Sequence, residues 1–408
     1  MTTTKTPLIE NKYLVTFAFV TALFMLWGIA ITMGDVLNRH FQQVLDLSKE
    51  DSSLVQFSIF GAYAIMGIPA GIFMKKFGYK NGVLLGLTLY ALGAFLFIPS
   101  ANAESFTFFR IALFVLACGL ATLETVAHPF IAGLGDEKTS DQRINFGQSF
   151  NGLGAVLGPI IGGRFILREG QGYTDELFTV KILYIIIGIV ITTTCIAFAF
   201  VKVPPVQEAH HNDTGTGETT LGDAYKKLFK RRHFIWAIIA QFFNCAAQGG
   251  TWAFFINYGN EKMGISNEDA AYYFSVSMAM MMAGRFIGTY LMRFIKPHTL
   301  LATFALANIA MCIIVAQSFG WVSFIALIMI NFFFSIMFPT IFSLGLKDLG
   351  AATKQGSSFI VMGVVGAAIF PKLMGKIADI DTATAYYLPI ICYLVIFIFG
   401  YKMYRVRK

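Results

Sequence analysis

The chain has 408 residues, of which 56% are hydrophobic, 15% are aromatic and only 13% are charged. An ordinary soluble domain carries about a quarter charged residues, so this composition argues against a soluble protein and predicts a polytopic membrane protein. The net charge of +8 would suit nucleic acid only as one clustered basic face. Here the basic residues are scattered along the chain, and we expect no nucleic-acid partner.

Apolar runs of about 20 residues, the length that crosses a bilayer, recur along the whole sequence. The polar start of the chain precedes a first run of full span length, so we expect a membrane anchor there and no cleaved signal peptide. The sequence predicts twelve membrane-spanning helices, at residues 13–38, 52–75, 80–99, 106–133, 142–166, 178–202, 233–259, 269–294, 298–317, 319–345, 352–376 and 383–404.

The loop charges predict the orientation of these spans. An even number of spans places both termini on one side, and most lysines and arginines of the loops lie on that side. Basic loops stay in the cytoplasm. We therefore expect both termini to be cytoplasmic, in a multi-pass protein of the cytoplasmic membrane.

One long polar interruption divides the chain. It predicts an N-terminal half at 1–202, a cytoplasmic linker at 203–232 and a C-terminal half at 233–408. The linker begins with two prolines and ends with the basic stretch LGDAYKKLFKRR, which is typical of a short amphipathic helix at a membrane surface.

The two halves repeat each other's sequence. A proline followed six residues later by a glycine occurs at the end of both the fourth and the tenth span, and the sequence GQSF precedes Gly154 as GSSF precedes Gly363. The spacing along the chain is almost the same for both matches. Parallel repeats of this kind are a known way of building transporters.

Two carboxyl groups lie within predicted spans. Asp35 is near the outer end of the first, and Glu124 is about two-thirds of the way down the fourth, too deep to reach either interface. Ionisable groups inside the membrane are rare and mark functional sites by default, and a low-dielectric environment makes a carboxyl group easier to protonate. We expect both acids to carry protons inward. The alternatives are that Asp35 marks a helix end and that Glu124 forms a structural pair with an arginine or with His128, whose own expected role is helix packing.

Neutral polar side chains in several spans predict a site for an uncharged, polyhydroxylated ligand. Amides both donate and accept hydrogen bonds, and an aromatic face covers an apolar C–H face. Any single amide could instead join two helices. The candidate ligand-binding residues are Glu124, Gln148, Asn151, Gln241, Asn244, Gln248, Trp252 and Asn331.

Catalytic and metal-binding patterns are missing from the sequence. The six histidines do not have the spacing of metal ligands, and no nucleophile–base motif occurs. We expect neither an enzyme nor a metal or other cofactor.

Together, several segments resemble the fucose permease branch of the major facilitator superfamily, the fucose–galactose–glucose:proton symporters. The segments are LWGIA and GDVL around Trp27 and Asp35, IPAGIFMKKFGYK, LETVAHPF, FGQSFNGLGA, AQFFNCAAQGGTW, GRFIGTYLMRF, FPTIFSLGLKDLG and GSSFIVMG.

This resemblance implies an all-α membrane protein with twelve transmembrane helices in two pseudo-symmetric six-helix halves. It further implies proton-driven sugar uptake by alternating access, with the sugar bound between the halves. Asp35 and Glu124 would serve proton coupling and sugar binding, and Gln148 and Asn151 match residues that line the family's cavity. Trp27 joins the candidate ligand-binding residues because it lies within one of the resembling segments.

The cytoplasmic loop after the second span resembles the superfamily's motif, a glycine followed by D-R-x-G-R-K. From it we expect Lys75, Lys76 and Lys80, together with Arg285 of the eighth span, to gate the cytoplasmic side, with lining of the cavity as the alternative role of Arg285. Lys75 stands where the motif has aspartate.

Other departures concern the sugar. Gly34 and His128 stand where the family has asparagine, and glucose/galactose members typically have glutamine at the position of Glu124. Glu124 therefore favours L-fucose as the ligand, with glucose, galactose or another neutral hexose as the alternative. A transporter-like sugar sensor is a further alternative, although no loop is large enough for a signalling domain. We expect a functional monomer.

Overall fold

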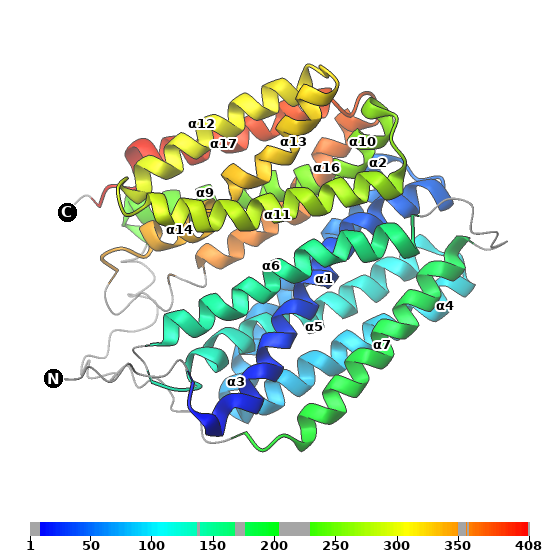
Figure 1. Ribbon diagram of the computed structural model, residues 1–408, viewed down its shortest axis with the longest axis vertical. Coiled ribbons are helices and arrows are strands. Elements are labelled where there is room, and N and C mark those ends of the chain that lie inside the picture. Colours follow the sequence, from blue (N-terminus) through cyan, green and yellow to red (C-terminus); the bar gives the residue numbers. More distant parts are fainter. Residues whose placement is uncertain are drawn as a thin grey trace. The chain divides into compact units, whose positions relative to one another are not determined.

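Helices are the only regular secondary structure among the residues that the computed structural model describes, which are 9–136, 139–167, 176–203, 229–349, 356 and 359–406 (Figure 1). Helical residues occupy the described part of every predicted span, and the all-α fold class is confirmed. The α-helices are α1 (Leu14–Val44), α2 (Lys49–Ser52), α3 (Leu54–Phe95), α4 (Phe97–Asn102), α5 (Phe106–Ala132), α6 (Ser140–Phe165), α7 (Glu176–Phe200), α9 (Arg232–Ala253), α10 (Phe255–Met263), α11 (Asn267–Leu291), α12 (Pro297–Ala316), α13 (Trp321–Phe334), α14 (Met337–Gly345), α16 (Gly366–Ala378) and α17 (Leu388–Ile398).

Polarity distinguishes three of the predicted spans from the others. By length and apolar composition alone, nine helical stretches among the described residues are able to cross a membrane. Three predicted spans are not among these nine, namely those occupied by α6, by α9 with α10, and by α11. Their amide and charged side chains reduce the apolar character of these helices. Because polar groups in membrane helices face protein or water rather than lipid, these helices are the first place to look for a binding site.

The turn between the second and third predicted spans is a single glycine. Gly78 lies inside α3 with φ +83° and ψ 170°, which is not a helical conformation. Residues with a side chain rarely adopt a positive φ, whereas glycine does so at little cost. The two spans predicted at 52–75 and 80–99 are therefore separated by a break at one position.

Two other predicted spans are interrupted helices. The span at 233–259 breaks at Phe254, where φ is −114° and ψ is 11°, between α9 and α10. The span at 319–345 breaks between α13 and α14. A break leaves backbone groups without their helical hydrogen-bond partners. At the first break, Asn38 of α1 supplies such a partner by donating its Nδ2–H to the carbonyl of Ala253 at 2.8 Å.

Glycines allow helix backbones to touch in both sequence repeats. A Cβ atom at Gly154 of α6 would lie 2.1 Å from the carbonyl oxygen of Met25 in α1, and one at Gly28 would lie 2.2 Å from that of Asn151. In the second repeat, a Cβ atom at Gly366 of α16 would lie 2.1 Å from the carbonyl oxygen of Phe242 in α9. Small residues permit such close crossings in membranes, so each repeat uses the same packing device.

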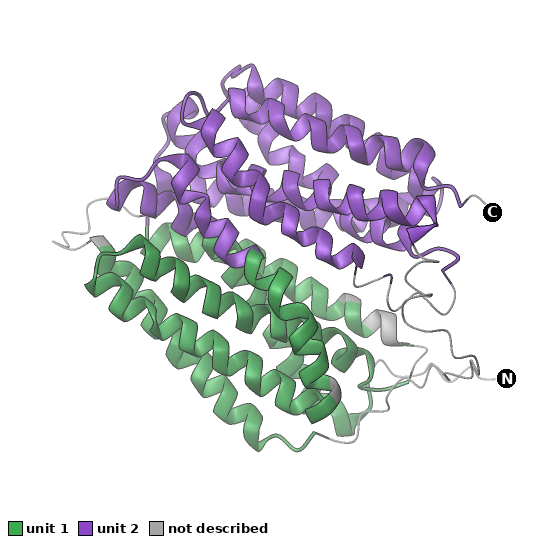
Figure 2. Ribbon diagram, turned by 180° about the vertical axis from the view of Figure 1, so that it is seen from behind, with its two compact units in different colours: residues 1–34, 61–166, 170–216 green, residues 35–60, 167–169, 217–408 purple. Residues whose placement is uncertain are grey.

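The chain forms two compact units (Figure 2). Unit 1 is Met1–Gly34, Gly61–Ile166 and Gly170–Thr216, and unit 2 is Asp35–Phe60, Leu167–Glu169 and Gly217–Lys408. The end of α1 and the start of α3 thus group with unit 2. Of the linker predicted at 203–232, residues 204–228 lie outside the described part of the chain, and the division into halves stays a prediction.

Candidate functional site

Unit 1 brings four polar and aromatic residues together with one histidine. We call them the His128 cluster: Trp27 of α1, Tyr63 of α3, Glu124 and His128 of α5, and Gln148 of α6. All five are half-buried. Three of them, namely Trp27, Glu124 and Gln148, are ligand-binding residues predicted from the sequence, while Tyr63 was not identified.

The ring of His128 makes a hydrogen bond through each of its nitrogens. Nδ1 lies 2.9 Å from the backbone carbonyl oxygen of Glu124, one helical turn earlier. Nε2 lies 2.6 Å from the amide nitrogen Nε2 of Gln148. His128 therefore bridges α5 and α6, a more specific role than the packing expected from the sequence.

Aromatic residues of α1 hold the cluster in place. The ring of His128 meets that of Phe24 edge-on, with centroids 5.0 Å apart, and that of Trp27 at 6.5 Å. The indole N–H of Trp27 donates to the hydroxyl of Tyr63 at 2.6 Å. Asn151, also predicted as a ligand-binding residue, donates its Nδ2–H to the carbonyl of Phe24 at 3.2 Å.

The carboxylate of Glu124 makes no ion pair within the described part of the chain. The side chain of His128 contacts the backbone carbonyl of Glu124. It does not form a charged pair with the carboxylate of Glu124. An unpaired acid inside an apolar helix is costly, which argues against a purely structural role for this residue.

Asp35 lies in unit 2 and is buried. Its carboxylate accepts a hydrogen bond from Nε2 of Gln56 at 2.6 Å, and Gln56 is buried as well. Gln56 was not identified from the sequence, because amides are common in membrane helices and only the fold places this one beside the acid.

The predicted ligand-binding residues of α9 differ among themselves. Gln241 and Asn244 are fully buried, and neither amide has a hydrogen-bond partner among the described residues. Gln248, two turns after Gln241, is half-buried. The three side chains follow one another at helical spacing on α9 and present unused donors and acceptors along it.

Trp252 and Asn331 are paired with each other. The indole N–H of Trp252 donates to Oδ1 of Asn331 at 2.8 Å, and Nδ2 of Asn331 donates to the hydroxyl of Ser277 at 2.8 Å. This buried chain joins α9, α13 and α11, and it matches the alternative in which an amide links helices. The ligand-binding role of these two residues stays a prediction.

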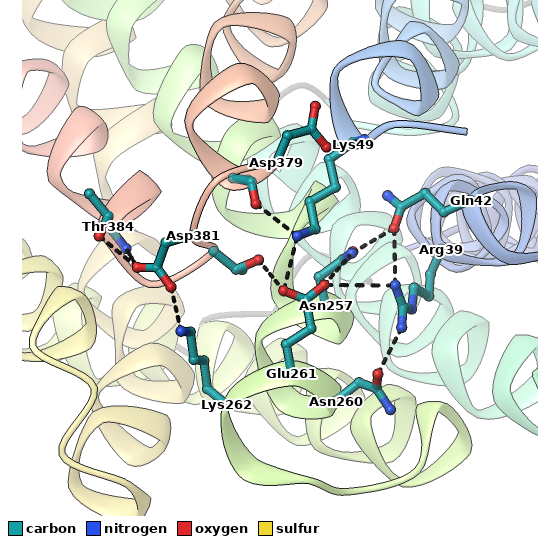
Figure 3. Close-up of polar contacts among 12 residues, drawn as sticks. Arg39, Gln42, Lys49, Asn257, Asn260, Glu261, Lys262, Asp379, Asp381 and Thr384 are labelled. Atoms are coloured by element: carbon teal, nitrogen blue, oxygen red, sulfur yellow. Dashed lines mark hydrogen bonds and ion pairs between the residues drawn. The ribbon is translucent and has the colours of Figure 1, made fainter. Parts of the chain in front are cut away.

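A larger set of ionic and amide groups, which we call the Glu261 cluster, lies where α1, α2, α10 and the segment after α16 meet within unit 2 (Figure 3). Lys49 binds the carboxylate of Glu261 at 2.9 Å and the carbonyl of Ala378 at 2.7 Å. Arg39 lies 3.9 Å from Glu261. Its members are Arg39, Gln42, Lys49, Asn257, Asn260, Glu261, Lys262, Asp379, Asp381, Thr382 and Thr384.

Short helix α2 is fixed against this cluster by its backbone. The N–H groups of Lys49 and Glu50 donate to the two carboxylate oxygens of Asp379 at 2.6 and 3.1 Å. A Cβ atom at Gly375 would lie 2.8 Å from Cα of Glu50, so glycine is needed for the approach. The sequence did not indicate this cluster, since its partners are far apart in the chain.

Two carboxylates of the Glu261 cluster are held in the charged form. Burial alone would raise the pKa of Glu261, but hydrogen bonds from Thr382 and Lys49 and the charge of Lys49 outweigh it and lower the pKa. Partial burial likewise opposes ionisation of Asp381, but hydrogen bonds from Lys262 and Thr384 outweigh it and lower the pKa to about 2. The cluster therefore stays ionic at neutral pH.

The predicted gating residues are distributed as follows. Lys80 donates to the carbonyls of Ala199 and Val201 at 2.7 and 2.9 Å, at the C-terminal end of α7, where a cation is favourable. Lys76 is exposed and Arg285 is half-buried. The side chain of Lys75 lies outside the described part of the structure. Their gating role stays a prediction.

Comparison with known proteins places this geometry in context. The sequence profile of the Major Facilitator Superfamily matches residues 13–404. The chain is 38% identical to the L-fucose-proton symporter of Escherichia coli K12, over 96% of this chain and 93% of that protein. It is 35% identical to the glucose/galactose transporter of Brucella abortus biovar 1, over 96% and 94%. The crystal structure of FucP in the outward conformation, 38% identical, matches 96% of this chain and 99% of that one with a TM-score of 0.70.

Proposed function

Because the chain belongs to the Major Facilitator Superfamily, we propose that it is a proton-coupled symporter that imports a neutral sugar by alternating access, with L-fucose as its substrate. Two of its relatives bear the name L-fucose-proton symporter, at 38% and 32% identity over almost the whole chain. In these relatives sugar and proton move together, and the same coupling is proposed here.

The observation that carries the proposal is the His128 cluster around an acid without an ion pair. Glu124 lies inside an apolar helix and is half-buried, one turn before His128, whose ring contacts an indole and an amide. The amide supplies donors and acceptors for hydroxyl groups, the indole supplies a face for C–H groups, and the carboxyl group is able to exchange a proton. A neutral sugar and a proton are the ligands that this combination fits.

The proposed order of events uses both acids. Asp35 is loaded from the outside, sugar binds near Glu124, and the carboxyl groups release their proton on the cytoplasmic side after the sugar has left. The Glu261 cluster holds the ends of α1 and α2 against α10, and we propose that it opens when the outer side opens. Neutralising a buried carboxyl group before a conformational change lowers the cost of moving it through an apolar environment.

The remaining parts of the proposal concern setting and partners. We propose a monomer in the cytoplasmic membrane of a bacterium, surrounded by lipid, with both termini in the cytoplasm. Transport rather than catalysis is its activity, and it uses no metal or other cofactor. A sugar sensor would bind sugar without moving it, so transport measurements distinguish the two.

The test is uptake into proteoliposomes with an imposed inward proton gradient. Labelled L-fucose is expected to accumulate above its external concentration, and a protonophore is expected to abolish the accumulation. If uptake only brings the internal L-fucose concentration to the external one, with or without the protonophore, the symport proposal is wrong. Sugar binding without any uptake would favour the sensor.

A second candidate substrate is glucose or galactose. The glucose/galactose transporter of Brucella abortus is 35% identical to this chain, which lies between the 38% and the 32% of the two fucose relatives. Competition of uptake by L-fucose, D-glucose and D-galactose over the same range of concentrations separates the candidates, because the true substrate competes at the lowest concentration.

A further inference from the structure

His128 is the titratable side chain of the His128 cluster that the proposed function leaves unused. It lies between the two residues that the function needs most, on the same helix as Glu124 and within hydrogen-bond distance of Gln148. Its other neighbours are the rings of Phe24 and Trp27. Its contacts define what it does.

The two hydrogen bonds of His128 fix its tautomer. The backbone carbonyl of Glu124 only accepts, so the ring nitrogen Nδ1, 2.9 Å away, carries the hydrogen. In a neutral imidazole the other nitrogen then accepts. Nε2 of His128 therefore accepts a hydrogen from the amide nitrogen of Gln148 at 2.6 Å.

This contact sets the direction of the Gln148 amide. One N–H of Gln148 is committed to His128, so the carbonyl oxygen Oε1 at the other end of the planar amide points away from the ring. Turning the amide over would bring its oxygen against Nε2, acceptor against acceptor. Packing of Phe24 and Trp27 on the ring, with Trp27 tied to Tyr63, keeps the ring from turning to compensate.

We propose that His128 is a positioning residue that determines specificity: it orients the amide of Gln148 so that the carbonyl oxygen faces the sugar and accepts a hydrogen bond from one hydroxyl group. This inference rests on the proposed function, and it identifies the carbonyl oxygen of Gln148 as the group that recognises that hydroxyl.

The test uses fluorinated sugars, because fluorine cannot donate a hydrogen. Sugar exchange without a proton gradient is measured in proteoliposomes for L-fucose and its 2-, 3- and 4-fluoro derivatives. At the hydroxyl that Gln148 reads, fluorine is expected to raise KM about tenfold, the effect of one lost hydrogen bond, with little change in the maximal rate. Gln148→Leu identifies that position, since it removes the penalty there and at no other position.

His128→Phe keeps an aromatic ring but removes the acceptor, so the amide of Gln148 is free to turn and offer a donor or an acceptor. The fluorine penalty at that position is expected to fall below about threefold. The control is His298→Phe, which removes another histidine, stacked on Tyr404 and outside the cluster, and should leave the penalty unchanged. An unchanged penalty in His128→Phe overturns the inference.

A measurement on the unmodified protein stands beside the variants in case His128→Phe does not fold. Nitrogen NMR of ¹⁵N-histidine protein is expected to show His128 as the neutral ring with hydrogen on Nδ1, and a ring with hydrogen on Nε2 contradicts the inference. If the unmodified protein exchanges none of L-fucose, D-glucose and D-galactose, the proposed function fails. Normal exchange with an unaltered fluorine penalty in His128→Phe defeats only the role of His128.

Discussion

The predicted ligand-binding amides of α6 in unit 1 and of α9 in unit 2 are used in opposite ways. In unit 1, Gln148 and Asn151 each donate to a protein acceptor and remain half-buried. In unit 2, Gln241 and Asn244 are fully buried and have no partner among the described residues. A buried polar group without a hydrogen bond costs about 1–3 kcal/mol. The first pair is already oriented, whereas the second pair has the most to gain from a ligand or from a change of conformation.

The difference does not come from the backbone. In both sequence repeats, a glycine lets two helices touch, α6 on α1 through Gly154 and α16 on α9 through Gly366. The same helix packing is thus found beside amides that have hydrogen-bond partners in unit 1 and beside amides that lack them in unit 2. The difference shows that polarity of a membrane helix identifies where a site lies, while the partner of each amide decides whether it is structural or available.

The largest effect is expected from Glu124→Gln, which keeps the shape of the His128 cluster and removes the group that changes charge. Proton-driven accumulation should fall at least about a hundredfold, while exchange of sugar without a gradient persists, because the remaining hydrogen bonds of the cluster are unchanged. Uptake and exchange in the same proteoliposomes provide the measurement. Normal accumulation by this variant would show that Glu124 is structural.

The contrast between the units is tested directly by Gln241→Leu and its counterpart Gln148→Leu. Gln241→Leu removes an unpaired buried amide and is expected to raise the free energy of unfolding by about 1–3 kcal/mol, with sugar affinity about tenfold weaker. Gln148→Leu leaves Nε2 of His128 without its donor and is expected to lower stability by about 1 kcal/mol. Denaturation in detergent and sugar binding give both quantities.

The same pair of variants has an outcome that would break the comparison. If Gln241→Leu destabilises the protein as much as Gln148→Leu does, the amide of Gln241 has a structural partner after all. Asn244→Leu repeats the test one helical turn along α9 and should behave like Gln241→Leu.

A third region, the Glu261 cluster, provides a case in which acidic and basic side chains form ion pairs, Lys49 with Glu261 and Lys262 with Asp381. The ion pair between Lys49 and Glu261 is partly buried, with side chains 14% and 30% exposed. A double-mutant cycle of Lys49→Met and Glu261→Gln is expected to show a coupling of about 1 kcal/mol. Gln42, a buried member of the cluster, serves as the reporter: in Gln42→Cys, a water-soluble thiol reagent should react several-fold faster once Glu261 is replaced. Equal rates would mean that the pair does not hold this end closed.

The smallest effect on stability is expected when the pH is lowered. The pKa of Asp381 is lowered to about 2 from an ordinary 3.8, so its contribution to stability is complete above about pH 4 and is lost as the pH falls towards 2. Asp381→Asn should remove this part of the acid sensitivity. Melting temperatures of both proteins at pH 5 and pH 3 check this prediction. An equal fall in melting temperature in the variant and the unmodified protein would contradict it.

The sequence was sufficient for the fold and for part of the site. Apolar runs predicted the spans, and the resemblance directed attention to Glu124 and Gln148, which the structure brings to the same cluster. Helix breaks such as the one at Phe254 were not predicted, because a break inside an apolar run changes neither the length nor the composition of the run.

Partners across the fold could not be predicted. Tyr63 beside Trp27, Gln56 beside Asp35 and Glu261 beside Lys49 all join residues far apart in the chain. Each residue type is ordinary in its own helix or loop, and only tertiary packing shows its role. His128 is the clearest case, since a packing role was expected and two hydrogen bonds were found.

The most direct test of the central claim is accumulation of L-fucose in proteoliposomes under an imposed inward proton gradient, compared between the unmodified protein and Glu124→Gln. We predict that the unmodified protein concentrates the sugar and loses this ability with a protonophore, and that the variant exchanges sugar but does not concentrate it. Accumulation that is independent of the gradient, or equal in the two proteins, would contradict the account.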